Sequence, residues 1–400
     1  MTRRRVAVLG AGIMGSSLAI YLARLGAAVT LVDRESAPMA GTSRWNEGKI
    51  HLGYLYGADS TLGTARHILP GGLAFRRLLS DLVAADVNEH ATTRDDIYLV
   101  HEDSVVPLDV LGRQFTAVSD LIRAHPRADD YLTTLTAARA VPLTRSELDG
   151  LASGRIVGGF RVPERSVETQ WVADAVVGAV AAESGVRFRG DTTVTSVEST
   201  DTGVRVVGSP ELDEPFDAAV NALWAGRLEI DRTVGLFPSH SWSHRYRLCV
   251  FVRTRRPVDV PSALVAVGPF GDVKNYNGRD FYISWYPAGL VAEGRDVTLD
   301  VPEPLAGARR ARFVADVRAG LGSCMPSIDR VFEEAAELTV AGGHVFARGG
   351  GSIGDPRSGL HRRDRFGVER AGAYFSVDTG KYSTAPWLAE RLARTIMGVD

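Results

Sequence analysis

Three features are scarce in this 400-residue sequence: cysteine, an excess of one charge, and long hydrophobic runs. Its only two cysteines, Cys249 and Cys324, lie far apart, which excludes a disulfide framework or a metal-type cysteine cluster and fits a reducing cytoplasm. The formal net charge of −2 gives no broad field to attract nucleic acid or a membrane surface. No apolar run approaches the roughly 20 residues needed to cross a bilayer. We therefore expect a cytoplasmic protein without a membrane or nucleic-acid partner.

The first residues resemble a secretory leader in one respect, because Met1–Arg5 is basic and apolar residues follow. A secretory leader has this order, but glycines at 10, 12 and 15 interrupt the apolar segment, so we do not expect export. The remaining composition is that of a globular protein, 45% hydrophobic and 24% charged. Abundant Ala, Arg, Val and Asp hint at a bacterial source with a high-GC genome. The length predicts two domains or one large interleaved domain.

The N-terminal residues predict a βαβ unit. Arg5–Leu9 reads as a buried strand, Ile13–Leu25 as a helix that Gly26 ends, and Ala28–Val32 as a second strand. A long ordered loop is expected over 38–60. Further helices are expected at 72–84, 108–124, 172–184, 309–321 and 385–397. Further strands are expected at 97–100, 186–188, 194–198, 204–207, 216–221, 245–253, 263–267, 280–286 and 373–377.

This order of elements predicts an α/β fold. Units of α/β type at both ends and an antiparallel middle indicate a discontinuous Rossmann-like domain into which an α+β domain built on an antiparallel sheet is inserted. We assign 1–90, 155–228 and 345–400 to the dinucleotide-binding domain. The substrate domain takes 91–154 and 229–344.

A dinucleotide fingerprint, G-x-G-x-x-G, occupies residues 10–15 between the first strand and the first helix. Gly10 allows the tight turn, Gly12 lets a diphosphate approach the backbone, and Gly15 lets helix and strand pack closely. The amides at the helix N-terminus then face the phosphates. Asp33 closes the second strand at the spacing that suits a ribose contact.

Asp33 also favours a cofactor without a 2′-phosphate, since its carboxylate would repel that group. NAD and FAD therefore both fit, and the fingerprint does not choose between them. Arg34 can cover an adenine or reach a phosphate, although such an arginine is more often a solvated loop residue. A tight turn without a nucleotide is the remaining alternative.

Four separated segments resemble the FAD-dependent family of D-amino-acid oxidase, glycine oxidase and sarcosine oxidase. They are Val6–Asp33, Gly41–Lys49, Phe216–Ala225 and Tyr374–Lys381, the last followed by Ala385-Pro386. The resemblance implies FAD, held without a covalent bond, and a hydride transfer from substrate to flavin N5. Two departures from the family pattern concern the cofactor contacts: Leu223-Trp224 stands where a small pair is usual, and Lys381 stands near the usual His-Gly.

The residues expected to hold FAD come from the fingerprint and from these four segments. They are Gly10, Gly12, Ile13, Met14, Gly15, Asp33, Arg34, Thr42, Ser43, Asn46, Gly48, Lys49, Val194, Asn221, Ala222, Trp224, Gly354, Thr379, Gly380 and Lys381.

Three residues are candidates for catalysis: Lys381, Lys49 and Arg348. A cation at Lys381, before a helix that starts near Ala385, can stabilise the anionic reduced flavin, and Lys49 can promote the reaction with O₂. The family often binds a substrate carboxylate through arginine. Arg348 is the first choice for that role, and the further candidates are Arg357, Arg253 and Arg44.

Two further features have competing interpretations. His51 is the only histidine in position for a covalent flavin link, but a hydrogen-bonded packing role is the more common one. Aromatic residues of the middle sheet can line the substrate pocket or belong to the core. They are Tyr276, Tyr282, Trp285 and Tyr286. No metal site is expected.

The sequence thus predicts an FAD-dependent oxidase of an amine or amino acid that cleaves a C–N bond and returns electrons to O₂. The alternatives are an FAD-dependent dehydrogenase of a hydroxy acid or sugar C–O bond, an NAD-dependent hydroxyacid dehydrogenase, and a non-catalytic nucleotide-binding scaffold. The sequence does not identify the substrate or the oligomeric state.

Overall fold

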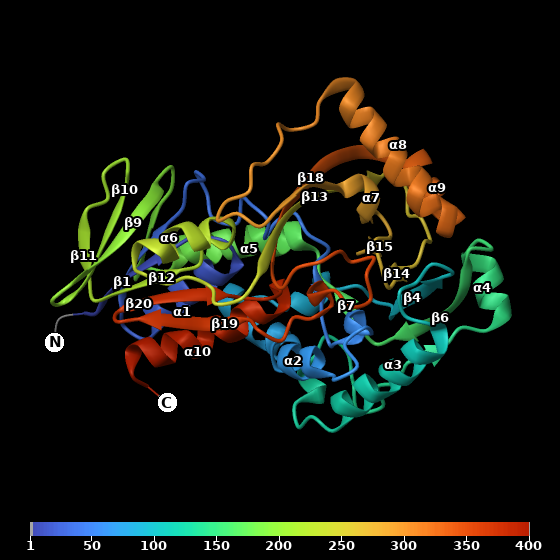
Figure 1. Cartoon of the computed structure of the whole chain (residues 1–400), viewed down its shortest axis with the longest axis horizontal. Helices are drawn as coiled ribbons and strands as arrows, with labels where there is room; N and C mark the ends of the chain where they lie inside the picture. Colours follow the sequence, from blue (N-terminus) through green and yellow to red (C-terminus); the bar gives the residue numbers. More distant parts are fainter. Residues whose placement is uncertain (1–2, 400) are drawn as a thin grey trace.

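The computed structural model describes residues 3–399, and a six-stranded, mostly parallel sheet organises its N-terminal and C-terminal parts (Figure 1). The strand order is β19-β20-β12-β1-β2-β8, and only the edge strand β19 is antiparallel to its neighbour. The strands are β1 (Arg5–Leu9), β2 (Ala28–Val32), β8 (Val186–Arg189), β12 (Ala218–Asn221), β19 (Gly367–Ala371) and β20 (Tyr374–Asp378).

Both faces of this sheet are covered, as expected for parallel strands with continuous apolar sequences. Val6 and Val8 of β1 point to a helical layer, whereas Ala7 and Leu9 point to a small three-stranded sheet. The helical layer holds α1 (Ile13–Arg24), α2 (Gly63–Val83), α5 (Thr169–Ala182) and α10 (Ala385–Met397). The small sheet holds β9 (Thr193–Thr200), β10 (Gly203–Ser209) and β11 (Glu214–Phe216).

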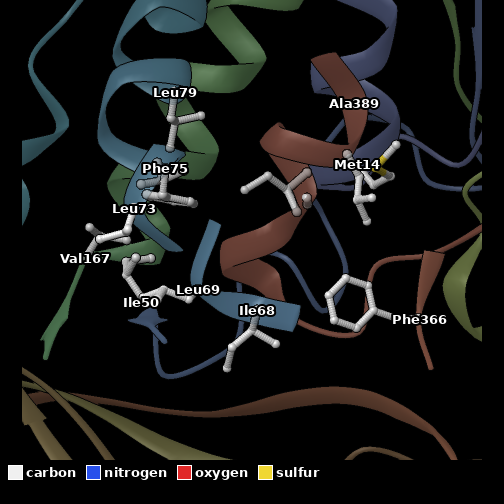
Figure 2. Close-up of a cluster of buried hydrophobic side chains, with 14 of the residues drawn as sticks. Met14, Ile50, Ile68, Leu69, Leu73, Phe75, Leu79, Val167, Phe366 and Ala389 are labelled. Carbon is white, nitrogen blue, oxygen red and sulfur yellow. The ribbon is translucent and has the colours of Figure 1, made fainter. Parts of the chain in front are cut away.

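Figure 2 shows how the helical layer joins segments from distant parts of the chain. Phe75 and Leu79 of α2 lie in one cluster with Met14 of α1 and Ala389 of α10. Phe75 is fully buried. This packing brings the C-terminal helix back to the first βαβ unit, so both ends of the chain contribute to the same layer.

A second, nine-stranded sheet forms the other half of the molecule. Its order is β17-β13-β16-β15-β14-β4-β6-β5, and β18 pairs with the long strand β13. The strands are β4 (Asp96–His101), β5 (Val141–Pro142), β6 (Ile156–Val162), β13 (Trp242–Thr254), β14 (Ala263–Ala266), β15 (Gly271–Asn275), β16 (Asp280–Trp285), β17 (Leu290–Gly294) and β18 (Ala335–Arg348).

The two faces of the large sheet differ in chemistry. Val250, Val252 and Ile283 pack under the helix α8 (Gly307–Cys324) in an apolar core. On the opposite face, β13 presents Arg245 and Arg247 to a cavity. Because side chains alternate along a strand, one face is apolar and the other carries charge.

The expected fold class is confirmed, although several elements differ from the expectation, and three of them bear on the site or the domain bounds. Helix α2 begins at Gly63 rather than residue 72 and carries Pro70 inside it, a residue that normally marks a helix start. Strand β18 was not expected, since it contains Gly342-Gly343, a pair that usually marks a turn. Strand β6 pairs with β4 in the large sheet, although it lies within 155–228. The domain bounds therefore stay a prediction.

Within residues 3–399, no helix combines the length and the apolar composition that a bilayer crossing requires.

Truncation of Phe75 tests the helical layer. We expect Phe75→Ala to lower the free energy of unfolding by about 3–5 kcal/mol, because it leaves a cavity among three helices. The matched control Phe237→Ala removes a ring that is 51% exposed and should change stability by less than about 1 kcal/mol. Denaturant unfolding measures both, and equal effects would contradict the assigned core.

Candidate active site

A cavity of about 540 Å³ lies between the two large sheets, within the range of roughly 300–1,000 Å³ for small-molecule sites. One end is lined by the N-terminus of α1, by Asp33 and by Val194, and the other by Arg245 and Lys381. The connecting walls come from the loop before β3 (Lys49–Ile50), the turn after β12, strands of the large sheet, and residues 377–382.

The geometry at the α1 end requires glycine. Gly10 has φ +95°, and a Cβ there would lie 2.7 Å from the carbonyl oxygen of Ala222. A Cβ on Gly15 would lie 1.8 Å from the carbonyl oxygen of Gly10. Strand β12 and helix α1 can approach this closely only without side chains at these positions.

Asp33 fixes the same turn through both of its oxygens. Oδ2 accepts a hydrogen bond from the Ala11 amide at 2.6 Å, and Oδ1 accepts one from the Glu35 amide at 3.0 Å. The Ser43 hydroxyl oxygen accepts from the Ile13 amide at 2.9 Å. These bonds hold the end of α1 open toward the cavity, where its amides and dipole favour an anion.

These residues fit a flavin dinucleotide. Gly12 lines the cavity beside α1. A Cβ at this position would lie 3.0 Å from Ser43 Oγ. Because glycine has no side chain, the backbone here stays accessible from the cavity. The α1 end would hold the diphosphate, with the adenosine toward Asp33 and Val194. The flavin ring would then lie toward Lys381.

Sixteen of the expected cofactor residues line this cavity. They are Gly10, Gly12, Ile13, Met14, Asp33, Arg34, Thr42, Ser43, Asn46, Lys49, Val194, Ala222, Trp224, Thr379, Gly380 and Lys381. Four others lie outside the wall: Gly15, Gly48, Asn221 and Gly354.

The positions of these four residues explain why they do not line the cavity. Gly15 and Gly48 permit close backbone approach, the latter to the Val167 carbonyl. Gly354 is exposed on its loop, and its neighbour Ile353 reaches the cavity in its place. Asn221 is fully buried, and its carboxamide shapes the turn that follows β12 by accepting a hydrogen bond from the Leu223 amide at 3.1 Å.

Trp224 lies in that turn, at one of the two departures from the family pattern. Its φ is +57°, which is uncommon for a bulky residue. The indole lines the cavity, and its Nε1 donates to the His344 carbonyl of β18 at 2.8 Å. Trp224 thus connects the Rossmann-like sheet to the large sheet across the cavity wall.

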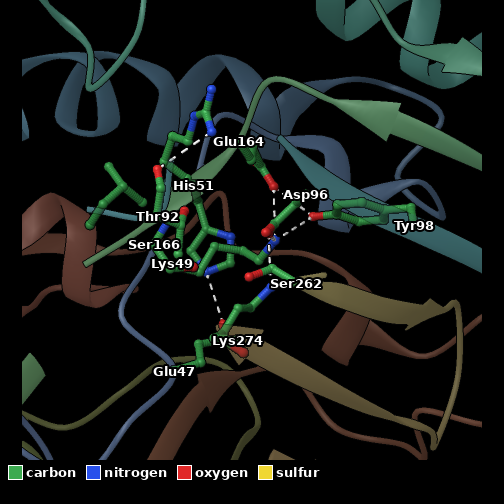
Figure 3. A network of polar contacts seen from close by, with 12 residues as sticks. Glu47, Lys49, His51, Thr92, Asp96, Tyr98, Glu164, Ser166, Ser262 and Lys274 are labelled. Atoms are coloured by element: carbon green, nitrogen blue, oxygen red, sulfur yellow. Dashed lines mark hydrogen bonds and ion pairs between the residues drawn. The ribbon is translucent and has the colours of Figure 1, made fainter. Parts of the chain in front are cut away.

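The expected catalytic role of Lys49 does not agree with its environment (Figure 3). Its ammonium has no exposed surface, forms an ion pair with Asp96, and lies 3.3 Å from Glu164 Oε2 and 3.2 Å from Tyr98 Oη. The ammonium of Lys274, a residue of β15, lies 2.8 Å from Asp96 Oδ2. Two carboxylates neutralise Lys49, so its charge is unavailable to a flavin or to O₂.

Glu164 links this buried network to the cavity loop. Its Oε1 accepts from the Leu52 amide at 2.6 Å and from the Gly53 amide at 3.2 Å. Its Oε2 accepts from Tyr98 Oη at 2.6 Å. The network therefore holds residues 49–53 against the large sheet, which is a positioning role.

The four arginines proposed from the sequence for a substrate carboxylate lie outside the cavity wall. Arg348 pairs with Glu369 and with Asp378, the latter at 3.3 Å. Arg44 pairs with an aspartate, and the more exposed Arg253 and Arg357 do the same. Each guanidinium already has a carboxylate partner, so the assignment of Arg348 to substrate binding is corrected.

Besides Arg34 at the Asp33 end, three arginines line the cavity toward Lys381: Arg245, Arg247 and Arg363. Their partners are neutral, namely Tyr286 Oη at 3.2 Å, Ser284 Oγ at 3.4 Å, and main-chain carbonyls. Within the described part of the chain, the Nε atoms of Arg245 and Arg247 have no hydrogen-bond partner. The sequence did carry a signal for two of them, because Arg245 and Arg247 alternate at the start of the strand expected at 245–253.

Lys381 adds a fourth cation at this end of the cavity. Its Nζ lies 5.6 Å from the centre of the Tyr56 ring. Burial lowers the pKa of Lys381 to about 8. The nearby Glu47 carboxylate raises this pKa, whereas the positive charges of Arg363, Arg245 and Arg247 lower it. Lys381 is therefore mostly charged at pH 7, at the place expected from the sequence.

His51 lines the cavity as a neutral imidazole. Burial and nearby Lys381 lower its pKa to about 4. Its Nε2 lies 3.5 Å from Glu47 Oε1, and its Nδ1 has no hydrogen-bond partner (Figure 3). A buried base oriented by a carboxylate, with a free nitrogen in a cavity, is suited to accept a proton.

The aromatic residues of the middle sheet divide between the two interpretations. Tyr282 and Tyr286 line the cavity. Tyr276 packs with Cys249 beside Tyr282, and Trp285 packs into the core on the α8 side of the sheet.

The covalent or noncovalent attachment of the flavin stays a prediction, and the noncovalent form remains our expectation.

Comparisons with known proteins support FAD as the cofactor. A family model described as FAD dependent oxidoreductase (DAO) matches residues 5–393. Glycerol-3-phosphate dehydrogenase 1 of Mycobacterium tuberculosis is 30% identical over 253 residues, which cover 58% of this chain and 44% of that protein. The chain thus spans less than half the length of this relative.

Solved structures share the fold along the whole chain. Glycine oxidase from Geobacillus kaustophilus has a TM-score of 0.70 at 19% identity and covers 99% of this chain and 96% of its own. L-α-glycerophosphate oxidase from Mycoplasma pneumoniae, solved with FAD bound, has a TM-score of 0.65 at 14% identity and covers 99% and 95%. These likenesses show the fold.

Substitution of Gly12 tests the cofactor cradle. We expect Gly12→Val to weaken FAD binding by about tenfold or more, because the side chain occupies the approach of the diphosphate. In the control Gly154→Val, an added Cβ meets open space, and binding should not change. Titration of the FAD-depleted protein with FAD measures both, and unchanged affinity in Gly12→Val would contradict the assigned cradle.

Removal of Lys49 tests the buried network. We expect Lys49→Met to lower the free energy of unfolding by about 3–5 kcal/mol, because two carboxylates lose a buried counter-charge. The control Arg145→Met breaks an exposed pair and should change stability by less than about 1 kcal/mol. A stable Lys49→Met protein that had lost only its reaction with O₂ would instead restore the catalytic role.

Proposed function

Because this chain belongs to the DAO family of FAD-dependent oxidoreductases, we propose that it oxidises the C–N bond of a small amine or amino acid that carries an anionic group. Family membership decides for FAD over NAD, which the fingerprint alone left open. We propose O₂ as the electron acceptor and the cytoplasm as the compartment.

The observation that carries this proposal is the set of cations without carboxylate partners at one end of the cavity. Arg245 is only 5% exposed, and an uncompensated buried guanidinium is unfavourable unless a ligand pairs with it. Arg247 and Arg363 border the same space, and Lys381 adds a further charge. A carboxylate or phosphate would satisfy these groups through charge-assisted hydrogen bonds.

The residues of the chain would prepare the substrate for oxidation. The bound FAD supplies the electron acceptor for the carbon–nitrogen oxidation. Arg245, Arg247 and Arg363 would hold the anionic group, which fixes the orientation of the reacting carbon. His51 would accept the proton that an ammonium group must lose before its bond is oxidised, and Glu47 would orient and stabilise the imidazolium.

Oxidation of a C–O bond is the second candidate. Sequence similarity supports it, since the curated relative at 30% identity is a glycerol-3-phosphate dehydrogenase. The cluster of four cations suits a phosphate as well as a carboxylate. His51 would then take the proton of a hydroxyl group, a step for which a base is more necessary than for an amine.

Anaerobic reduction of the bound flavin tests the two candidates. Amino acids, N-methyl amino acids, amino phosphates, hydroxy acids and glycerol phosphates are mixed with the holoenzyme, and loss of the visible flavin absorbance is recorded. We expect anionic amines to reduce the flavin and to yield peroxide once O₂ is admitted. Reduction by uncharged amines only would contradict the proposal, and reduction by hydroxy compounds only would select the second candidate.

The dependence of kcat/KM on pH tests His51 and Lys381. His51 is neutral above its pKa of about 4 and Lys381 is charged below its pKa of about 8. The rate should therefore rise as pH increases through about 4 and fall as pH increases through about 8. Lys381→Arg should remove the upper limb, since arginine stays charged. An upper limb that is unchanged in Lys381→Arg would contradict this assignment.

A further inference from the structure

The cavity also contains a buried carboxylate that the oxidation itself does not use. Asp272 of β15 lines the cavity and is only 4% exposed. Its Oδ1 accepts a hydrogen bond from the Ser284 hydroxyl at 2.5 Å, whereas its Oδ2 has no N–H or hydroxyl donor among residues 3–399. A buried carboxylate oxygen without a donor is unfavourable, which indicates that a ligand supplies one.

A second carboxylate, Glu47, lies close to Asp272. Both residues line the cavity. Burial together with the charge of Glu47 raises the pKa of Asp272 to about 7. Lys274 is two residues along the same strand, but its ammonium bonds to Asp96 at 2.8 Å. Glu47 faces His51 and Lys381, which hold the pKa of its carboxyl group well below the usual range. The hydrogen bond between Glu47 and Asp272 requires a shared proton, and a cationic group of a ligand can take the place of that proton.

One hydroxyl group separates this negative region from the cations. Ser284 Oγ donates to Asp272 Oδ1 and accepts from Arg247 Nη2 at 3.4 Å. Arg247 thus lies on one side of Ser284, and Asp272 on the other. A ligand that satisfies both must carry its positive and negative groups only a few bonds apart.

We propose that Asp272 and Glu47 form a recognition site for the ammonium group of the substrate, which is accordingly a small zwitterion. Its anionic group pairs with Arg247 and the neighbouring arginines. This inference rests on the proposed function and deepens it, because it selects amino compounds over their hydroxyl analogues. A hydroxyl donates one neutral hydrogen bond and leaves the carboxylates uncompensated, whereas an ammonium provides three donors and a charge.

Matched ligand pairs test this site in the holoenzyme. L-alanine is compared with L-lactate, and 2-aminoethyl phosphate with 2-hydroxyethyl phosphate, so that each pair differs only in the amino or hydroxyl group. Binding is measured anaerobically from the perturbation of the visible spectrum of bound FAD. In the unmodified protein, the amino member should bind at least about tenfold more tightly, as a charge-assisted hydrogen bond predicts.

The variant Asp272→Asn keeps the shape of the side chain and removes its charge. It should weaken binding of the amino member by about tenfold or more and change the hydroxyl member by less than about threefold. Asp149→Asn removes an exposed charge on the helix Arg145–Leu151 and should change neither. Ser284→Ala provides a second variant if Asp272→Asn loses FAD, and it should weaken the amino member selectively.

The outcomes separate this inference from the proposed function. If both members of a pair bind equally, or if the variants weaken both alike, the ammonium site is wrong while the anion site stands. If neither pair perturbs the flavin, the arginine cluster does not bind small anions, and the proposed function fails together with the inference.

Discussion

The structure depends on one buried ionic junction, in which Asp96 binds two lysines from different parts of the chain. Lys49 enters from the loop that borders the cavity, and Lys274 from the large sheet. Glu164 completes the junction and holds the backbone at Leu52 and Gly53. Loss of Asp96 would leave Lys274 without a carboxylate partner, and loss of Lys49 would leave two carboxylates with one lysine. Each member is therefore needed for the charge balance of the junction. It sets the position of His51 and Glu47 relative to β15, and therefore the geometry of the proposed active site.

The junction differs from the cavity in how its charges are compensated. In the junction, each buried cation meets a carboxylate of the protein. In the cavity, Arg245 and Arg247 have only neutral partners, and one oxygen of Asp272 has no N–H or hydroxyl donor among residues 3–399. Because the interior weakens electrostatic interactions much less than water does, such groups favour a ligand of complementary charge. The fold thus keeps structural charges paired and leaves the charges that face substrate available.

The sequence predicted the fold better than the chemistry of the site, for physical reasons. The first βαβ unit and the dinucleotide fingerprint depend on local periodicity and on glycine spacing, and both strands of that unit have the expected bounds. Sixteen expected cofactor residues line the cavity, and those outside the fingerprint and Asp33 were expected from the family resemblance. By contrast, Lys49 pairs with Asp96 and Arg348 pairs with Asp378. Both partners are distant in sequence, so no local pattern indicates these ion pairs. Arg363 and Asp272 reach the cavity through tertiary packing, which no local pattern indicates.

The central claim is that the N-terminus of α1 binds the diphosphate of FAD while distant segments enclose its ring. A crystal structure of the holoenzyme tests it most directly. We predict the diphosphate at the N-terminus of α1, beside Gly12 and Met14, and the flavin ring between His51 and Lys381, next to Arg245. A diphosphate bound elsewhere, or a ring located at the Asp33 end of the cavity, would contradict the account.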